Sequence, residues 1–294
     1  MCGRQAWSDN AFLDLPDEYA QPDNARFCVL PLPHEQTVSF GKGTAAGPAA
    51  ILEASAQVEL FDEQFLREFY HAGIHTLPPL HLRGSLENID EQIYTAAAGI
   101  VQMDKFLLTL GGEHSITAPL VKAYQEKYSD LSVLQIDAHA DLRAEYDGSP
   151  YSHACVMRRI HEMKVPCLGV GIRSFCGDEH EYMQVNQIDY ISPSMIRQSL
   201  PDVLQSILNA LTDQVYITFD IDGLDPSVSP GTGTPEPGGL WWHEALAILE
   251  AVGRSKRIVG ADVVEVAPIA GQQVTEFAAA RLAYKLIAVA QLRQ

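Results

Sequence analysis

The sequence predicts an α/β fold in which helices cover both faces of a mostly parallel β-sheet. Three observations support this prediction: short apolar runs recur, longer stretches with helical periodicity separate them, and polar residues gather directly after the runs. An apolar run without alternation is typical of a strand that is buried on both faces, as strands of parallel sheets are. The regular alternation of strand and helix then implies crossover connections that keep the strands parallel.

The expected strands and helices alternate along the whole chain. The strands are six short apolar runs, at residues 27–32, 106–110, 131–136, 165–170, 215–219 and 258–264. The helices are longer segments with apolar residues at helical spacing, at residues 48–60, 89–103, 115–128, 195–211, 241–252 and 274–292. No Pro-, Gly- or Ser-rich linker and no repeat of fixed period interrupts the series, so we expect residues 1–294 to form a single domain.

Composition and charge indicate a globular protein and exclude one class of partner. Hydrophobic residues make up 47% of the 294-residue chain and charged residues 20%, which is ordinary for a folded protein. The net charge of −18 argues against nucleic-acid binding, because a phosphate backbone is bound by clustered Lys and Arg. An acidic protein suits a cationic small molecule better.

The cysteines and the N-terminal residues bear on the compartment. The cysteines are odd in number and show no Cys-x-x-Cys spacing: Cys2, Cys28, Cys155, Cys167 and Cys176. They are expected to be reduced thiols in the cytoplasm. No basic segment followed by an apolar stretch opens the chain, and no apolar run approaches the roughly 18 residues of a membrane span, so we expect neither export nor membrane insertion.

Polar residues stand at the carboxyl ends of four predicted strands. Gly111 to His114 follow one strand, Asp137 to Asp141 follow the next, and Asp220-Ile221-Asp222 and Glu265 close two later ones. The carboxyl ends of parallel strands meet at one edge of a sheet, where ligands bind in open α/β folds. The sequence therefore predicts that residues far apart in the chain converge on one site.

The residue types in these motifs are those of a metal site. If the backbone is extended, alternate residues of Asp137-x-His139-x-Asp141 and of Asp220-x-Asp222 point the same way and present their side chains together. With His114 they make four carboxylates and two imidazoles without a thiolate, a set that suits manganese or magnesium better than zinc or copper(I). Four carboxylates would also balance the charge of two divalent ions.

Together these motifs resemble the signature motifs of the ureohydrolases, the arginase and agmatinase family. The similarity runs from about Gly41 to the C-terminus, and the first forty residues lack a clear match. The matching segments are Gly111-Gly112-Glu113-His114-Ser115, Asp137-Ala138-His139-Ala140-Asp141, Ser152-His153-Ala154, Phe219-Asp220-Ile221-Asp222-Gly223-Leu224-Asp225-Pro226, Gly231-Thr232-Gly233-Thr234-Pro235 and Asp262-Val263-Val264-Glu265-Val266-Ala267-Pro268.

The resemblance implies a three-layer αβα arginase-like fold that holds two manganese ions. Asp137 and Asp220 would bridge the ions, His114 and Asp141 would complete the ligands of one, and His139 and Asp222 those of the other. The family also forms trimers and hexamers, so a homo-oligomer is expected.

Two further residues receive catalytic roles from the resemblance. His153 aligns with the histidine assigned to proton shuttling, and an imidazole titrates near the required pH. Glu265 aligns with the glutamate that anchors the substrate guanidinium, which would also explain a carboxylate at the end of an apolar strand. The neighbouring Cys155 is expected to be a buried thiol rather than the nucleophile of a cysteine-dependent guanidine hydrolase.

The loops favour agmatine as substrate, with putrescine and urea as products. Arginases carry acidic residues after a Gly-Leu-Arg motif, whereas Arg173 is followed here by Ser174-Phe175-Cys176. The segment after Asp141 contains Glu145 and Asp147, an acidic rim that would suit a cationic tail, and Thr234-Pro235-Glu236 resembles agmatinases.

Other readings stay open at this point. Guanidinobutyrate, guanidinopropionate and aminopropylagmatine share the guanidinium end, and Arg143 or Arg173 could hold a carboxylate; arginine is a less favoured substrate. A two-metal phosphoesterase would use similar ligands, but it should show an Arg or Lys clamp on the phosphate. A non-catalytic relative would be expected to lose ligands.

Overall fold

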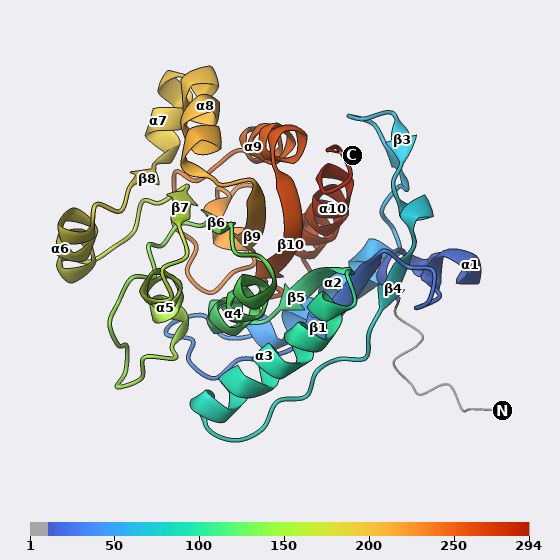
Figure 1. The fold of residues 1–294 in the computed structure, drawn as a ribbon, viewed down its shortest axis with the longest axis horizontal. Coiled ribbons are helices and arrows are strands. Elements are labelled where there is room, and N and C mark those ends of the chain that lie inside the picture. The colour runs from blue at the N-terminus through green and yellow to red at the C-terminus, as the bar shows by residue number, and fades with distance from the viewer. Residues whose placement is uncertain (1–10, 294) are drawn as a thin grey trace.

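The computed structural model, which describes residues 11–293, is built on one eight-stranded sheet whose strands are all parallel to their neighbours (Figure 1). In the order in which they lie side by side, the strands are β4 (Ile74–Thr76), β1 (Phe27–Leu32), β5 (Phe106–Gly111), β10 (Arg257–Val264), β9 (Gln214–Asp220), β6 (Leu131–Ile136), β7 (Cys167–Val170) and β8 (Tyr190–Ile191). A separate antiparallel pair, β2 (Phe61–Asp62) and β3 (Arg67–Glu68), lies outside this sheet.

Helices cover both faces of the sheet, as the sequence predicts. One face packs against α2 (Gly47–Ser55), α7 (Pro193–Gln198), α8 (Leu200–Ala210), α9 (Trp242–Ser255) and α10 (Val274–Val289). The other packs against α3 (Leu86–Gln102), α4 (Thr117–Lys127), α5 (Val156–Glu162) and α6 (Gly177–Asn186), and the short α1 (Asp17–Ala20) lies near β4.

The strands supply alternate side chains to the two helical layers. Val29 and Leu108 belong to one hydrophobic cluster, whereas their neighbours Leu30 and Leu107 belong to the other. Successive side chains of a strand point to opposite faces, so a strand between two layers must be apolar throughout. This explains the unbroken apolar runs and confirms the three-layer prediction.

All six predicted strands are present, with ends that shift by one or two residues. The sequence does not predict the edge strands β4 and β8, because strands of three and two residues are too short to show a hydrophobic pattern. The predicted helix at 195–211 is wrong in one respect: it is two helices, divided at Ser199. Pro201 lacks an N–H and would clash with the preceding turn, so one helix cannot run through it.

The polar motifs lie together at the carboxyl ends of the central strands. The four adjacent central strands β5, β10, β9 and β6 run parallel, so their carboxyl ends lie together. These are the four strands that the polar motifs follow. No helix within residues 11–293 has the length and apolar character that crossing a membrane requires.

Candidate metal centre

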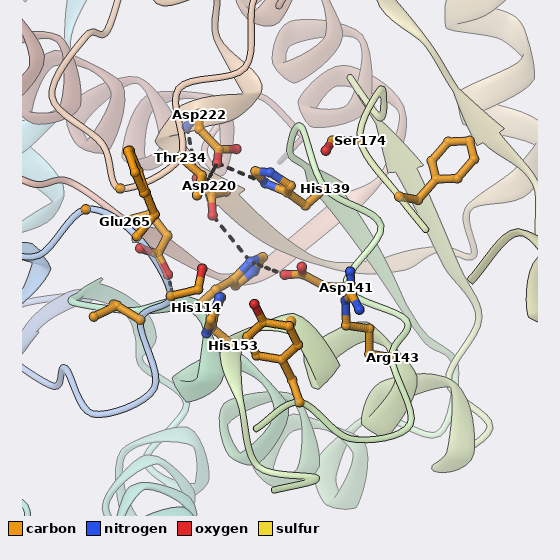
Figure 2. Close-up of a pocket in the computed structure, with 18 of the residues that line it drawn as sticks. His114, His139, Asp141, Arg143, His153, Ser174, Asp220, Asp222, Thr234 and Glu265 are labelled. Carbon is orange, nitrogen blue, oxygen red and sulfur yellow. Dashed lines mark hydrogen bonds and ion pairs between the residues drawn. The ribbon is translucent and has the colours of Figure 1, made fainter. Parts of the chain in front are cut away.

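A cleft of about 260 Å³ opens at the carboxyl edge of the central strands (Figure 2). The predicted ligands His114, His139, Asp141, Asp220 and Asp222 line it, together with the two candidate catalytic residues His153 and Glu265. The sixth predicted ligand, Asp137, is fully buried beneath them. The structure thus brings all eight predicted site residues together.

The first group of potential ligands surrounds the His114 imidazole. Its Nδ1 lies 3.1 Å from an oxygen of Asp137, 3.1 Å from one of Asp141 and 3.5 Å from one of Asp220. This nitrogen is buried and makes no hydrogen bond with good geometry. A buried nitrogen that faces three carboxylates without a hydrogen bond fits the position of a metal ligand.

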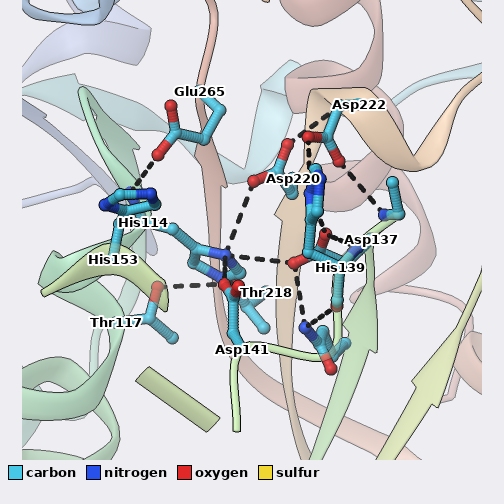
Figure 3. A network of polar contacts seen from close by, with 12 residues as sticks. His114, Thr117, Asp137, His139, Asp141, His153, Thr218, Asp220, Asp222 and Glu265 are labelled. Atoms are coloured by element: carbon cyan, nitrogen blue, oxygen red, sulfur yellow. Dashed lines mark hydrogen bonds and ion pairs between the residues drawn. The ribbon is translucent and has the colours of Figure 1, made fainter. Parts of the chain in front are cut away.

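The second group surrounds His139 and shares one carboxylate with the first. Nδ1 of His139 lies 3.1 Å from an Asp222 oxygen and 3.6 Å from Oδ1 of Asp137. His114, Asp137 and Asp141 could hold one ion, and Asp137, His139 and Asp222 another. Asp137 therefore stands between two adjacent sites, one oxygen toward each (Figure 3).

The backbone of the two Asp motifs is not extended, although the sequence analysis predicts an extended conformation. An extended Asp137-x-His139-x-Asp141 segment would point its side chains one way, but β6 ends at Ile136 and Asp141 has a left-handed φ of 52°. The His139 N–H donates to Oδ1 of Asp137 at 2.6 Å, and the Asp222 N–H donates to Asp220 at 2.9 Å within the turn Ile221–Gly223. The prediction of extended motifs is wrong because side chains that accept backbone N–H groups favour turns over strands.

The charges of this centre call for cations. Burial lowers the pKa of His139, but Asp222 and Asp137 outweigh it and raise that pKa to about 12. The pKa of Asp220 lies well above its ordinary value, through burial first and then repulsion by Asp222 and Asp137. Protons on His139 and Asp220 thus offset part of the negative charge of this centre, and divalent ions could take their place. Hard carboxylate and imidazole ligands fit manganese or magnesium.

Buried residues behind His114 fix which of its nitrogens faces the cleft. Its Nε2 lies 2.8 Å from Thr218 Oγ1, and the Thr218 hydroxyl donates to Asp262 at 2.7 Å. Because Thr218 gives its hydrogen to Asp262, it accepts one from Nε2, which leaves Nδ1 free as a ligand. Thr117 and Tyr216 also donate to Asp262.

Sequence reasoning missed this support. Asp262 stands in one of the matching motifs without an assigned role, and Thr218 lies just before another. The signal was present, since an Asp inside the apolar run 258–264 must be hydrogen-bonded once it is buried.

Glu265 is buried with a free side toward the cleft. Its Oε1 accepts the His114 backbone N–H at 2.7 Å, and its backbone has a left-handed φ of 63°. Within residues 11–293 it forms no ion pair with a Lys or Arg. Burial raises its pKa to about 8, with further repulsion from Glu113 and Asp222. A cation in the cleft would therefore stabilise its charged form.

The prediction that Glu145 and Asp147 form an acidic rim at the mouth of the cleft is wrong. Glu145 and Asp147 are exposed, and neither lines the cleft; the same loop contributes Arg143 and Tyr146 instead. The Arg143 guanidinium lies 5.0 Å from the centre of the Tyr146 ring, and its Nε is 3.8 Å from Glu179. Glu179 in turn accepts the backbone N–H groups of Leu142 and Cys176.

Two other sequence-based candidates have structural roles. The Arg173 side chain donates to the carbonyls of Gly171, Asp222 and Glu236 at 3.0, 2.8 and 2.6 Å, so it is not available for a substrate carboxylate. Cys155 is buried, and burial raises the pKa of its thiol to about 11, which disfavours a nucleophilic thiolate. Cys2 lies outside the described residues.

Comparisons with known proteins agree with this geometry. The family model described as "Arginase family" matches residues 25–288, so the match begins upstream of Gly41, where the resemblance of the sequence was expected to begin. The N(1)-aminopropylagmatine ureohydrolase of Synechocystis is 37% identical, over 95% of this chain and 96% of its own. The agmatinase of Bacillus subtilis is 35% identical, over 90% of both chains.

The fold comparison gives the same result. The crystal structure of agmatine ureohydrolase of Thermoplasma volcanium has a TM-score of 0.84 at 28% identity, covering 92% of this chain and 91% of that one. This chain is therefore an enzyme of the arginase family, the ureohydrolases, whose fold implies a binuclear metal site.

Proposed function

We propose that this protein is a manganese-dependent ureohydrolase that cleaves agmatine to putrescine and urea in the cytoplasm. The observation that carries the proposal is the pair of His/Asp groups sharing Asp137, beside a buried Glu265 that forms no ion pair with a Lys or Arg of residues 11–293. The centre suits two divalent ions, and Glu265 suits a guanidinium. The four cysteines within the described residues are free, in keeping with a reducing compartment.

The proposed ligands are the six predicted residues. Asp137 and Asp220 would be shared by the two ions, His114 and Asp141 would complete one set of ligands, and His139 and Asp222 would complete the other. When bound, two divalent ions lower the pKa of a water molecule and so supply a nucleophile at neutral pH. The contacts of Asp137 with the imidazoles of His114 and His139, at 3.1 and 3.6 Å, support its place between the two sites, and the 3.5 Å contact of Asp220 with His114 supports its inclusion.

The protein's own residues bind the substrate and move the proton. Glu265 holds the guanidinium by charge-assisted hydrogen bonds, which orients its carbon toward the metal centre. Expulsion of an amine requires that its nitrogen be protonated, and His153 is placed in the cleft lining to do so.

Replacing Glu265 by Gln should lower kcat/KM about 10- to 100-fold, because a charge-assisted pair with the guanidinium becomes a neutral contact. Gln has the shape of a protonated Glu, so the fold should remain intact. Steady-state urea assays, with metal content and melting temperature measured alongside, check this result. Glu53→Gln, on the exposed face of α2, is a matched control that should behave as wild type. Undiminished kcat/KM in the Glu265 variant would remove the anchor role.

All candidate substrates share the guanidinium group, so the assignment depends on how the cleft binds the other end of the substrate. Away from the six proposed ligands, Glu265 and His153, the charged residues of the cleft are Arg143 and Glu179. Glu179 already accepts two backbone N–H groups and lies beside Arg143, so the pair offers no free partner for an amino-acid head group. N1-aminopropylagmatine is the second candidate, favoured by the 37% identical relative that carries this name.

Agmatine should therefore be hydrolysed with at least about tenfold higher kcat/KM than arginine, because the α-carboxylate would lose its hydration without gaining a partner. Urea release from manganese-loaded protein should be measured over a range of agmatine, N1-aminopropylagmatine, arginine and guanidinobutyrate. A preference for N1-aminopropylagmatine over agmatine would select the second candidate. Guanidinobutyrate as best substrate would show that Arg143 binds a carboxylate, and failure of all four would refute the proposed function.

A homo-oligomer is also part of the proposal. An apolar groove beside the start of α10 is lined by Val58, Val228, Trp242, Val274 and Phe277, of which Val274 and Phe277 are half exposed. A surface of this kind supports contact between subunits. Light scattering in solution would measure the subunit number, for which trimers and hexamers are the expected values.

A further inference from the structure

The Thr37 hydroxyl lies at the centre of a hydrogen-bond network next to the cleft. Its Oγ1 is 2.8 Å from Oε1 of Glu113, 3.0 Å from the backbone nitrogen of His153 and 3.1 Å from Nδ1 of the same histidine. Thr37 belongs to the first forty residues, to which the sequence assigned no role. It joins the loop after β1 to the histidine proposed as proton donor.

Glu113 determines what this hydroxyl can do. Both of its oxygens are used as acceptors: Oε2 accepts the N–H groups of Gln36 and Thr37 at 2.6 Å each, and Oε1 accepts the hydroxyls of Ser115 and Thr37. A hydroxyl has one hydrogen, and the bond to a carboxylate is stronger than a bond to a neutral ring. Thr37 therefore gives its hydrogen to Glu113.

With its hydrogen committed, Thr37 can only accept from His153. Its two lone pairs face the backbone N–H and Nδ1 of that residue. If Nδ1 carried no hydrogen, two acceptors would face each other at 3.1 Å. Nδ1 is thus a donor, and the weaker contact of Ser152 Oγ with Nδ1, at 3.3 Å, is satisfied with Ser152 as second acceptor.

We propose that Thr37, held by Glu113, is a positioning residue that keeps His153 in the Nδ1–H tautomer and turns an unprotonated Nε2 toward the cleft. This inference rests on the proposed function, in which His153 handles the proton. Within the part of the chain that the structure describes, Nε2 makes no hydrogen bond, so it is available to the reacting groups.

The proton movement that this arrangement permits is simple. Nε2 takes up the proton that the attacking water releases, which gives an imidazolium, and then passes that proton to the leaving amine, while the hydrogen on Nδ1 remains hydrogen-bonded to Thr37 throughout. Thr37 and Glu113 neither gain nor lose a proton. Their contribution is to orient the ring and to exclude the tautomer whose Nε2 already carries a hydrogen and cannot accept one.

The first test reads the tautomer without using the reaction. Nitrogen NMR of isotope-labelled histidine distinguishes the protonated from the bare ring nitrogen, in full-length protein loaded with diamagnetic Mg²⁺. The signal of His153 is assigned by its loss in His153→Asn. We expect wild-type His153 to show a proton on Nδ1 in its neutral form; a proton on Nε2 instead would overturn the proposal, whether or not any variant folds.

The second test uses Thr37→Val, which has the same shape without the hydroxyl. We expect the Nε2–H tautomer to become populated and kcat to fall about 10- to 100-fold with little change in KM, since only part of the proton-transfer contribution is lost. Thr37→Ser should keep most of the activity, and Thr95→Val, exposed on α3, is a matched neutral control.

A double-mutant comparison separates positioning from a purely structural role. In a His153→Asn background, Thr37→Val should change kcat less than about twofold, because its effect passes through His153. Equal losses in both backgrounds would show that Thr37 acts independently of the histidine and contradict the proposal. Absence of urea from wild-type protein would instead refute the proposed function, and the NMR result would still decide the tautomer.

Discussion

Asp137→Asn, when incubated with manganese, is expected to retain little bound metal and to lower kcat at least about a thousandfold. Asp137 is fully buried and places one oxygen near each imidazole, so its change weakens both halves of the centre at once. Stabilisation of the transition state by bound metal amounts to several kcal/mol, which corresponds to a rate factor of about 10³ or more. Urea assays and elemental analysis of dialysed protein measure the two effects.

The control for this variant is Asp23→Asn, the same chemical change at an exposed position before β1. It should retain its metal content and activity. A further comparison is Asp222→Asn, which touches the His139 group alone and should leave the first group closer to full occupancy. Two manganese ions per chain in Asp137→Asn would contradict the bridging assignment, even if activity fell.

The location of the centre could be predicted because it depends on topology. A parallel sheet aligns the carboxyl ends of β5, β10, β9 and β6, and each of those ends carries a polar motif in the sequence. Side chains that follow adjacent strands therefore lie close together, and this does not depend on the conformation of the loops. For this reason the six candidate ligands lie together, although the expected extended backbone around Asp141 was wrong.

Contacts that depend on loop geometry could not be predicted in this way. The contact between Thr37 and His153 spans 116 positions in the chain and joins two irregular segments. Glu145 and Asp147 flank Tyr146, yet only Tyr146 lines the cleft, because the turn decides which side chain points inward. The spacing of residues along the sequence predicts which way side chains point in a strand or helix, but it does not predict this in a loop.

The buried residues behind His114 could be predicted in part. Asp262 lies within the otherwise apolar run 258–264 of β10, so its burial follows from the predicted fold. Its partners do not follow, because Thr117, Tyr216 and Thr218 come from a neighbouring helix and strand whose pairing was unknown. Strand order, once known, makes the network of His114, Thr218 and Asp262 understandable as support for one metal ligand.

His153→Asn is expected to lower kcat about 10²- to 10⁴-fold while both metals stay bound. The residue lies in the cleft lining outside the six proposed ligands, and a positioned general acid or base contributes a rate factor of this size. Asn can still donate a hydrogen bond from its amide toward Thr37, so the loop should keep its place. Urea assays across pH, with metal analysis of the same samples, provide the measurement.

The pattern of loss across variants distinguishes a proton donor from a structural histidine. A structural role predicts a lower melting temperature with kcat largely kept, whereas a proton donor predicts the reverse. His71→Asn, a half-exposed histidine far along the chain from the cleft residues, should match wild type in both properties. Near-normal turnover by His153→Asn would remove this residue from the mechanism and leave protonation of the leaving amine to solvent.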